Sequence, residues 1–401
     1  MLELDCGQEF DLAREEEFFA ALPSRPGVIA FEMRAAGAQP HLMRTADLRR
    51  AAERLLRPAE AGSKRLNLRE VAARVRYRAT GSKFEQTLTL YEQARRHLPS
   101  RYRDLLRLRP PAVLKVNLRG EYPRCYVTRR IRADEGFYFG PFASRRSAEA
   151  FSEGFLDLFK IRRCQIRIRR DPAFPGCIYS EMKMCLAPCF AGCTQQEYDA
   201  EARRVVEALA TSGESLSESI EREREAASEA LDFERAAALH KRLEKVSAAL
   251  RGAPELARRI EDLDAVILQR AAGEMTVAVF PLRAGLLAEP LFLRFGELSS
   301  QPRSVEAMLR QLLEPLRPEA GNRAAEAAEN TDANWRGRYG LRDAPPELAE
   351  HLAIVARWFY SNPRDGEILF REGDWPYRRL LRACGRILAP PDAAPATPAN
   401  P

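Results

Sequence analysis

The sequence predicts an α+β chain built of several domains. Two observations show strands: short apolar segments bounded by Gly, Pro and Asp occupy residues 20–45 and 112–142, and similar segments return after residue 260. A third observation shows helix, because the apolar positions of residues 195–251 recur at helical spacing. Together these patterns predict small mixed domains on either side of a helical segment.

The first elements follow from local signals. The segment LPSRPGVIAFEMR is expected to form a strand, and HLMRTADLRRAAERLLRP a short strand and then a helix that Asp47 can cap. Helical patterns are predicted at 66–77 and 83–107. The segments AVLKVNL, PRCYVTRRI and GFYFGPF are expected to form short strands.

The later elements begin with a helix at 195–210 and a helical hairpin that turns at Leu231-Asp232. After residue 260 the segments LDAVILQRAAG, EMTVAVFPLRAG and LAEPLFLRFG predict a partial β meander. Residues 318–340 contain few apolar residues and are expected to form a linker. Helix is predicted in PPELAEHLAIVARWFYS, a last element in WPYRRLLRACGRI, and disorder in the Pro-rich tail.

The charge is unevenly distributed. Sixty-four Lys and Arg exceed 57 Asp and Glu, for a net charge of +7. The basic residues concentrate in 95–170 and Glu in 214–235, which suggests one surface for phosphate and another for a different partner. No apolar run is long enough to span a membrane, and the acidic start does not have the pattern of a secretory signal. We therefore expect a cytoplasmic protein without a membrane partner.

Five of the eight cysteines fall between residues 164 and 193. In a reducing compartment such a cluster indicates metal binding more than disulfides. Twelve, seven and three residues separate Cys164, Cys177, Cys185 and Cys189. This irregular spacing does not contain the close pairs usual in structural zinc sites, so it favours a [4Fe-4S] cluster and leaves zinc as the alternative. Cys193 is a possible substitute ligand.

Several motifs in collinear order resemble the UvrC family of excinuclease proteins. They are YPRCYVTRR, YFGPF, FKIRRC, CIYSEMKMCLAPC and QQEY, followed by ASEALDFERAAALHKRL, and together they span roughly 110–300. The resemblance implies nucleotide excision repair, DNA binding, and a [4Fe-4S] cluster on the four cysteines. Arginines of the basic region are expected to contact phosphates without reading sequence. The candidates are Arg129, Arg130, Arg162 and Arg163.

The last of these motifs resembles the UVR motif, a helical hairpin that docks on an excinuclease B-like protein in this family. Phe233 would be the aromatic anchor, and Glu234 with Arg235 would fix the register. A hairpin packed on its own domain is the structural alternative. His240-Lys241 stands where the family usually has Arg-Asp, which could alter the choice of partner.

The resemblance also implies a GIY-YIG nuclease at the N-terminus, but its motifs are altered. Gly27-Val28-Ile29 and His41-Leu42-Met43 stand where the two tyrosine motifs are expected, and Ala51 stands at the position of the catalytic arginine. The remaining candidates for catalysis are weak. They are Glu92 (with Glu85 as an alternative) as a ligand of Mg²⁺ or Mn²⁺, Arg49, and His41 as a substitute base.

We therefore expect a GIY-YIG-like fold without its nuclease site. The resemblance reaches only the start of the family's C-terminal half, so the RNase H-like and helix–hairpin–helix domains are expected to be absent. The predicted divisions are 1–20 (extension), 21–108 (GIY-YIG-like domain), 109–213 (Arg-rich, cysteine-cluster region), 214–252 (UVR-type hairpin), 253–317 (small β region), 318–388 (linker and C-terminal helices) and 389–401 (disordered tail).

These features favour a DNA-repair protein that binds DNA and an excinuclease B-like partner. One alternative is an active endonuclease that cuts damaged DNA through an altered site. An alternative of another class is an iron–sulfur redox or RNA-related protein, although the sequence shows no substrate pocket for it.

Overall fold

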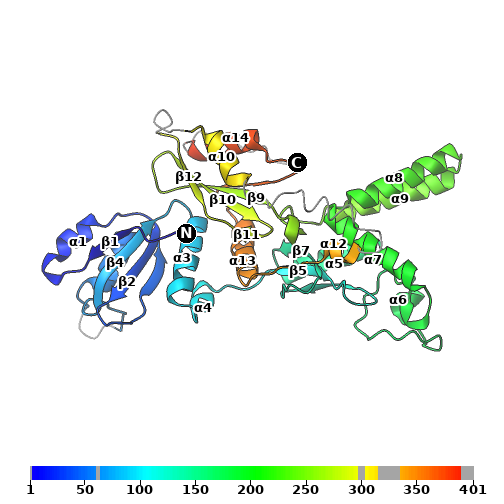
Figure 1. The fold of residues 1–401 in the computed structure, drawn as a ribbon, viewed down its shortest axis with the longest axis horizontal. Helices are drawn as coiled ribbons and strands as arrows, with labels where there is room; N and C mark the ends of the chain where they lie inside the picture. The colour runs from blue at the N-terminus through cyan, green and yellow to red at the C-terminus, as the bar shows by residue number, and fades with distance from the viewer. Residues whose placement is uncertain (1, 60–63, 297–302, 315–334, 390–401) are drawn as a thin grey trace.

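The structure is a computed structural model of the chain that describes residues 2–59, 64–296, 303–314 and 335–389. These residues form three antiparallel sheets with their associated helices (Figure 1). The mixture of helices and strands confirms the predicted α+β class. Most of the linker predicted after residue 318, and the tail from residue 390 onwards, lie outside the described residues.

The first sheet has the strand order β1-β4-β2-β3. Helices α1 and α2 cover one face, and α3 covers the other. The elements are β1 (Cys6–Glu9), the 3-10 helix η1 (Leu12–Arg14), α1 (Glu15–Ala21), β2 (Gly27–Met33), β3 (His41–Thr45), α2 (Leu48–Leu56), β4 (Ala72–Ala79), α3 (Lys83–His97) and α4 (Tyr102–Leu106).

Strand β4 lies where the sequence pattern predicted a helix at 66–77, so that prediction was wrong. Val75 and Tyr77 are buried, whereas Arg74 beside them is exposed. This alternation has the period of two that characterises a strand with one face in the core. Strand β4 pairs with both β1 and β2 and therefore joins the sheet together.

The first twenty residues, expected as an extension, are joined to this domain. Strand β1 pairs with β4, with Cys6 opposite Tyr77. The rings of Phe10, Phe18 and Phe19 are buried together, and the centroid of Phe18 lies 5.1 Å from that of Phe10 and 5.5 Å from that of Phe19. This aromatic group packs on the face of the sheet that α2 also covers.

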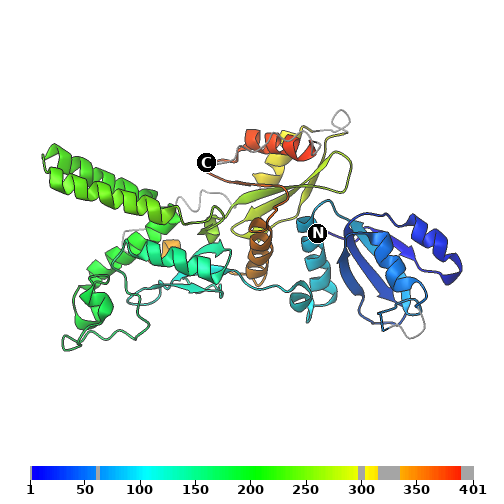
Figure 2. The same ribbon diagram turned by 180° about the vertical axis from the view of Figure 1, so that it is seen from behind.

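Helix α3 is buried along most of its length. It packs against the first sheet on one side and against the C-terminal region on the other, as both ribbon views show (Figures 1 and 2). The ring of Phe84 lies 5.1 Å from that of Phe280 and 5.3 Å from that of Trp358. One hydrophobic core is thus shared by segments that lie far apart in the sequence.

The Glu350 carboxylate fastens α13 (Leu348–Phe359) to α3 and α4. It accepts hydrogen bonds from the hydroxyls of Tyr91 (2.7 Å) and Tyr102 (2.6 Å) and from Nε of Arg103 (2.7 Å). The glutamate is buried, and the three donors replace the water that its charge would otherwise require.

The middle region contains the sheet β6-β5-β7-β8. Phenylalanine rings from β7 and α5 stack in a row in its core, with centroids 5.8 Å apart for Phe139 and Phe151 and 5.6 Å apart for Phe151 and Phe155. The elements are β5 (Ala112–Val116), β6 (Cys125–Thr128), β7 (Phe137–Phe142), α5 (Arg145–Leu156), α6 (Ile178–Glu181), the 3-10 helix η2 (Pro188–Phe190), α7 (Gln195–Ala210) and β8 (Arg258–Arg259).

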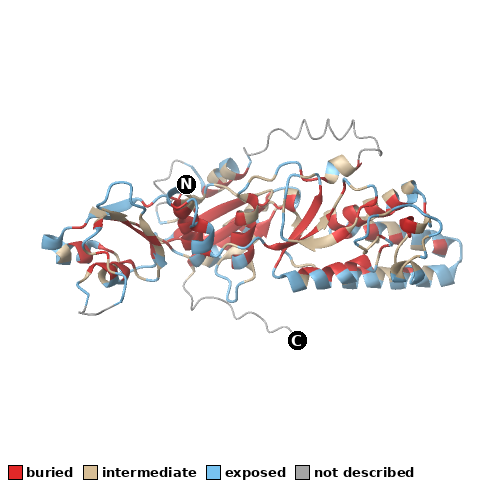
Figure 3. Ribbon diagram, turned by 90° about the horizontal axis from the view of Figure 1, so that it is seen from below, coloured by how far each residue is buried: buried red, intermediate tan, exposed pale blue. Residues whose placement is uncertain are grey.

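Helices α8 (Glu214–Glu229) and α9 (Phe233–Leu250) form the predicted hairpin, which projects from the body of the molecule (Figure 1). Gly213 starts α8 with φ of +89°, and a β-carbon there would lie 1.9 Å from Cδ1 of Leu250. The beginning of α8 therefore touches the end of α9, and only glycine fits this contact. Much of the hairpin surface is exposed (Figure 3).

The third sheet has the order β11-β10-β9-β13, with β12 also paired to β10. Helices α10 and α14 cover one face, and α13 covers the other. Strand β13 comes from a segment for which only helices were expected. The remaining elements are the 3-10 helix η3 (Ile260–Asp262), β9 (Ala265–Arg270), β10 (Thr276–Arg283), β11 (Leu286–Leu287), β12 (Leu291–Arg294), α10 (Val305–Leu313), α12 (Trp335–Tyr339), β13 (Glu367–Phe370) and α14 (Tyr377–Leu388).

Replacing Glu350→Gln is expected to lower the free energy of unfolding at pH 7 by about 1–3 kcal/mol, because a weaker acceptor is left beside the buried hydroxyls of Tyr91 and Tyr102. Burial raises the pKa of Glu350, but hydrogen bonds from Tyr102, Tyr91 and Arg103 lower it below the usual 4.5. The carboxylate therefore stabilises the fold fully above the unfolded-state pKa, and this contribution is lost as the pH falls through the lower folded-state value.

Urea unfolding at pH 7 and at successively lower pH measures this difference. The control is Glu367→Gln, which removes a more exposed pair with Arg386 and should cost about 1 kcal/mol or less. Equal stability of Glu350→Gln and the unmodified chain at pH 7 would contradict the role given to this carboxylate.

Candidate metal centre and nucleic-acid surface

The cysteine cluster lies in a long loop between α5 and α7. Apart from α6 and η2 this loop has no regular structure, and backbone hydrogen bonds tie it together instead. The N–H of Leu186 donates to the carbonyl of Lys160 (3.0 Å), and that of Asp171 donates to the carbonyl of Cys189 (2.9 Å). The loop is thereby folded back so that its cysteines approach one another.

The four predicted ligands lie close enough for their charges to affect the pKa of Cys185. Burial raises the pKa of the Cys185 thiol to about 11, against an opposing hydrogen bond from the N–H of Ala187. The negative charges of Cys164, Cys189 and Cys177 raise it further. Cys189 is buried, and the other three are partly exposed. Neighbouring thiolates repel one another, so ionisation of all four thiols would require a cation between them.

Two backbone features of the loop suit a thiolate-bound group. The N–H of Ala187 donates to Sγ of Cys185 (3.3 Å), and the N–H of Phe190 donates to the thiol of Cys189. Such hydrogen bonds to sulfur are among the means by which proteins tune iron–sulfur clusters. In addition, Lys183, Ala187 and Ala191 have φ of 55°, 55° and 60°. Non-glycine residues hold this left-handed conformation only where the surroundings fix it.

Arg162 supports the loop from within. Its Nε donates to the carbonyl of Tyr122 (2.9 Å), and its Nη1 donates to the carbonyls of Ile166 (2.9 Å) and Cys164 (3.4 Å). Arg163 donates to the carboxylate of Asp157 (2.8 Å). These two predicted phosphate contacts are therefore engaged with the protein itself.

Cys193 and Cys125 are the remaining cysteines of the middle region. Burial raises the pKa of Cys193, whose charged neighbours are Glu197, Arg170 and Cys189. Cys125 is buried in the middle core. Within the described residues, no three His, Cys, Asp or Glu side chains are already arranged to hold a single metal ion. Four thiols on one loop and the N–H···S contact at Cys185 are the chemistry that a larger cluster with ligands at separate corners would require.

Arg129 and Arg130 lie on a different surface from Arg162 and Arg163. Together with Arg103 and Arg132 they line a cavity of about 300 Å³. Nη1 of Arg129 donates to the carbonyl of Pro110 (2.8 Å), which fixes its position at the rim. The structure thus brings arginines that follow β6 close to α4, although α4 lies before them in the chain. The Arg-rich composition of both segments was the only sequence signal for this convergence.

The weak catalytic candidates do not meet in the described part of the chain. Arg49 donates to the carbonyls of Leu22 (2.8 Å) and Ala20 (3.0 Å) and so caps α1. Oε2 of Glu92 accepts from the N–H of Leu2 (2.5 Å). His41 lies beside Phe31, and burial, with a further contribution from Arg54, lowers its pKa.

The alternative residue Glu85 is buried and accepts from the N–H of Gly81 (2.9 Å). Ile29, which stands where the resemblance places a catalytic tyrosine, is also buried, and it packs in the core that contains Phe18 and Phe19. The face of the sheet that carries Ile29 is therefore covered by apolar side chains.

The end of the hairpin carries the predicted partner residues. Phe233 is 66% exposed and its neighbour Leu231 is 72% exposed, and Glu234 and Arg235 are exposed as well. The carboxylate of Asp232 accepts from the N–H of Arg235 (3.1 Å) and caps α9. Two large apolar side chains are thus exposed to solvent at the end of the projecting hairpin.

Comparison with known proteins places this geometry in a class. Residues 112–208 match the family described as UvrC/Cho excinuclease, middle domain, and this match covers strands β5, β6 and β7 and the cysteine loop. The chain therefore contains a domain similar to the excinuclease middle domain, followed by a helical hairpin. The curated relatives to which the longer stretch of the chain is similar are UvrABC system protein C sequences.

The UvrABC system protein C of Oleidesulfovibrio alaskensis is 29% identical over 272 residues, which are 67% of this chain and 38% of that protein. That of Dehalococcoides mccartyi strain BAV1 is 26% identical over 269 residues, 67% of this chain and 44% of that protein. The chain thus matches less than half the length of these relatives. No solved structure is significantly similar. Among the described residues, no helix has the length and hydrophobicity needed to cross a membrane.

Proposed function

We propose that the protein acts in nucleotide excision repair as a DNA-binding, partner-docking relative of UvrC whose N-terminal nuclease site is degenerate. The observation that carries this proposal is the continuity of the middle region: the matched domain bears an arginine surface, contains the cysteine loop, and leads directly into an exposed hairpin. The arginine surface, the cysteine loop and the hairpin each suit a binding role, and none of these roles requires cleavage of a phosphodiester bond.

The cysteine loop is proposed to hold a [4Fe-4S] cluster on Cys164, Cys177, Cys185 and Cys189. When bound, the cluster would link four points of a loop that has little regular structure, and its iron would compensate the thiolate charges. The protein contributes the N–H groups that point at sulfur and the Arg162 guanidinium that holds the loop carbonyls. Zinc remains the alternative metal.

The arginine surface is proposed to bind DNA phosphates. Arg129, Arg130, Arg132 and Arg103 line one cavity, where Arg103 forms an ion pair with Glu350. The other three guanidinium groups are exposed and can neutralise phosphates. Phosphate contacts position a protein on DNA without reading its sequence.

The nuclease site is proposed to be inactive because its positions have structural roles. Arg49 caps a helix, Glu92 binds a backbone N–H, and Ile29 fills the core. A phosphodiester nuclease needs an activated water and a bound divalent metal next to the phosphate. Cleavage through an altered site, with His41 as base and Glu92 holding Mg²⁺ or Mn²⁺, is the alternative, and a nicking assay tests it.

Anaerobically purified protein is expected to contain iron and acid-labile sulfide in equal amounts. Cys185→Ser should lower both, because it removes one ligand and its N–H···S contact. Cys193→Ser is the matched control and should retain both. Stoichiometric zinc without sulfide would overturn the choice of cluster, and loss of iron in Cys193→Ser alone would overturn the choice of ligands.

The double variant Arg129→Ala/Arg130→Ala is expected to bind duplex DNA about tenfold more weakly, with a salt dependence less steep by about 2 in log–log slope, since each phosphate contact contributes about 0.9. Fluorescence anisotropy at several salt concentrations measures both. Arg145→Ala/Arg146→Ala, two exposed arginines of α5, is the control. A preference for one sequence that the double variant abolishes would contradict phosphate binding.

Phe233→Ala is expected to weaken binding to an excinuclease B-like protein by about tenfold or more, because aromatic anchors contribute about 2 kcal/mol or more at such interfaces. Calorimetry with the purified partner measures the change. Leu12→Ala, an exposed apolar residue at the opposite end of the molecule, is the control. If both variants bind like the unmodified chain, the hairpin end is not the docking site.

No strand cleavage is expected when the protein is incubated with lesion-bearing duplex, Mg²⁺ or Mn²⁺ and an excinuclease B-like partner. Gel analysis of end-labelled DNA measures nicking, and a UvrC protein with both tyrosine motifs serves as the positive control. Nicking that Glu92→Ala eliminates would establish the alternative, an active endonuclease.

A further inference from the structure

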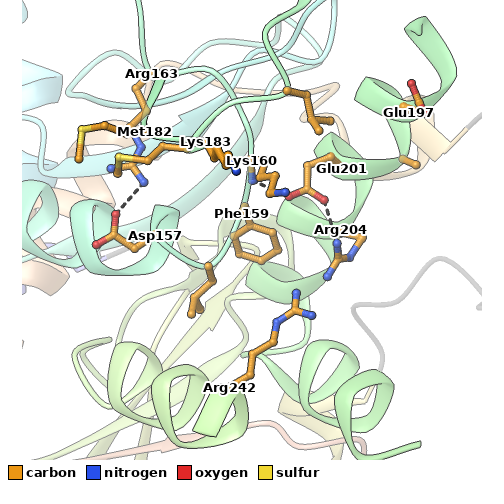
Figure 4. Close-up of a pocket in the computed structure, with 14 residues that line it drawn as sticks. Asp157, Phe159, Lys160, Arg163, Met182, Lys183, Glu197, Glu201, Arg204 and Arg242 are labelled. Atoms are coloured by element: carbon orange, nitrogen blue, oxygen red, sulfur yellow. Dashed lines mark hydrogen bonds and ion pairs between the residues drawn. The ribbon is translucent and has the colours of Figure 1, made fainter. Parts of the chain in front are cut away.

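A second cavity lies beside the cysteine loop and has no role in the function proposed above. Its volume is about 830 Å³, and it is bounded by the end of α5, the loop that contains α6, the first turns of α7, and α9 (Figure 4). Small-molecule sites in proteins usually measure about 300–1,000 Å³, so this cavity is large enough for a substantial ligand.

Basic side chains outnumber acidic ones in the lining of the cavity. Asp157 is paired with Arg163 (2.8 Å), and Glu201 is paired with Arg204 (2.8 Å). Glu197 accepts hydrogen bonds from the N–H and the hydroxyl of Thr194 at the start of α7 (2.7 and 2.9 Å). All three carboxylates of the cavity are therefore already engaged.

Three cations remain without a partner among the described residues: Lys160, Lys183 and Arg242. Lys160 and Lys183 come from two distant parts of the loop between α5 and α7, and Arg242 comes from the hairpin, so both elements direct positive charge at one space (Figure 4). Lys183 has the left-handed conformation, with φ of 55°, and its N–H donates to the carbonyl of Ser180 (3.1 Å). The cavity therefore presents a preorganised surface for an anion with several charges.

The cavity also has an apolar part. Phe159 is buried in its wall, and Met182, which is 62% exposed, lies near Lys183 at its edge. Leu158, Met184 and Leu186 complete this part of the lining. Polarizable methionine side chains pack well against flat rings. A ligand that carries both phosphate charges and an unsaturated ring would use both halves of the cavity.

We propose that this cavity binds unpaired nucleotides of a nucleic-acid strand, with Lys160, Lys183 and Arg242 at the phosphates and the methionine side against a base. This inference rests on the proposed function, because it assumes that the protein encounters DNA. A duplex is excluded by size, since its bases are stacked and paired inside a double helix. An acidic peptide would match the charges but would leave the apolar side without a ring.

The experiment is anisotropy of a labelled oligothymidylate with the purified protein. Lys160→Ala/Lys183→Ala/Arg242→Ala is expected to bind about tenfold more weakly, with a log–log salt slope less steep by about 2, because each lost single-strand phosphate contact contributes about 0.7. Binding of blunt duplex by the same variant is expected to stay within about twofold, since the duplex uses the Arg129 and Arg130 surface.

The matched control is Arg222→Ala/Lys241→Ala/Lys245→Ala. It removes the same number of exposed cations from the hairpin, none of which lines the cavity. This variant should bind the oligothymidylate like the unmodified chain. Thermal unfolding of both triple variants verifies that each is folded.

The outcomes distinguish the cavity inference from the proposed function. If the cavity variant binds oligothymidylate normally while Arg129→Ala/Arg130→Ala loses duplex binding, the cavity inference is wrong and the proposed function stands. If the unmodified chain binds neither nucleic acid, both are wrong. If polyglutamate or free thymidine monophosphate competes as strongly as the oligothymidylate, the cavity accepts an acidic peptide or a free nucleotide, and the strand proposal is overturned.

Discussion

The burial of α3 from two sides is the constraint on which the arrangement of this molecule depends. A surface helix needs one apolar stripe, but α3 places Phe84 against Phe280 and Trp358 while its opposite side supports the first sheet. Burial of each such aromatic side chain contributes about 1.5–3 kcal/mol. The buried Glu350 carboxylate helps to orient α13, because it accepts hydrogen bonds from three side chains on α3 and α4. The N-terminal and C-terminal regions are consequently parts of one body, and the middle region and hairpin are attached to that body.

Sequence patterns identified most elements, and the exceptions have physical reasons. A helix was predicted at 66–77 because alanine, leucine and arginine favour helices, yet pairing with two neighbouring strands makes residues 72–79 a strand. Strand β13 escapes prediction because four residues are too few for a periodic signal. The first twenty residues resemble an extension because β1 and α1 are stable only against the core that Phe10 and Phe18 complete. In all three cases long-range contacts outweigh the local pattern.

In the candidate sites, too, sequence patterns could group residues that are close in the chain but not residues that only the fold brings together. The four cysteines proposed as ligands lie on one continuous loop, so their spacing is a local signal that the sequence alone can carry. Sequence could not separate Arg162, which holds loop carbonyls, from Arg130, which is exposed to solvent, since both lie in runs of basic residues. The cations of the second cavity could not be grouped at all. Lys160 and Arg242 lie far apart in the sequence, and only the fold brings them to the same space.

The contact between Gly213 and Leu250 joins the two helices of the hairpin where they leave the body. From that point α9 runs 18 residues outward, and at about 1.5 Å per residue it spans about 27 Å. A protein seated on Phe233 would therefore stand well away from the arginine surface, and the two could be occupied together. Arg242 lies midway along this arm, so the length of α9 would set the distance between a strand bound in the second cavity and a partner bound at Phe233.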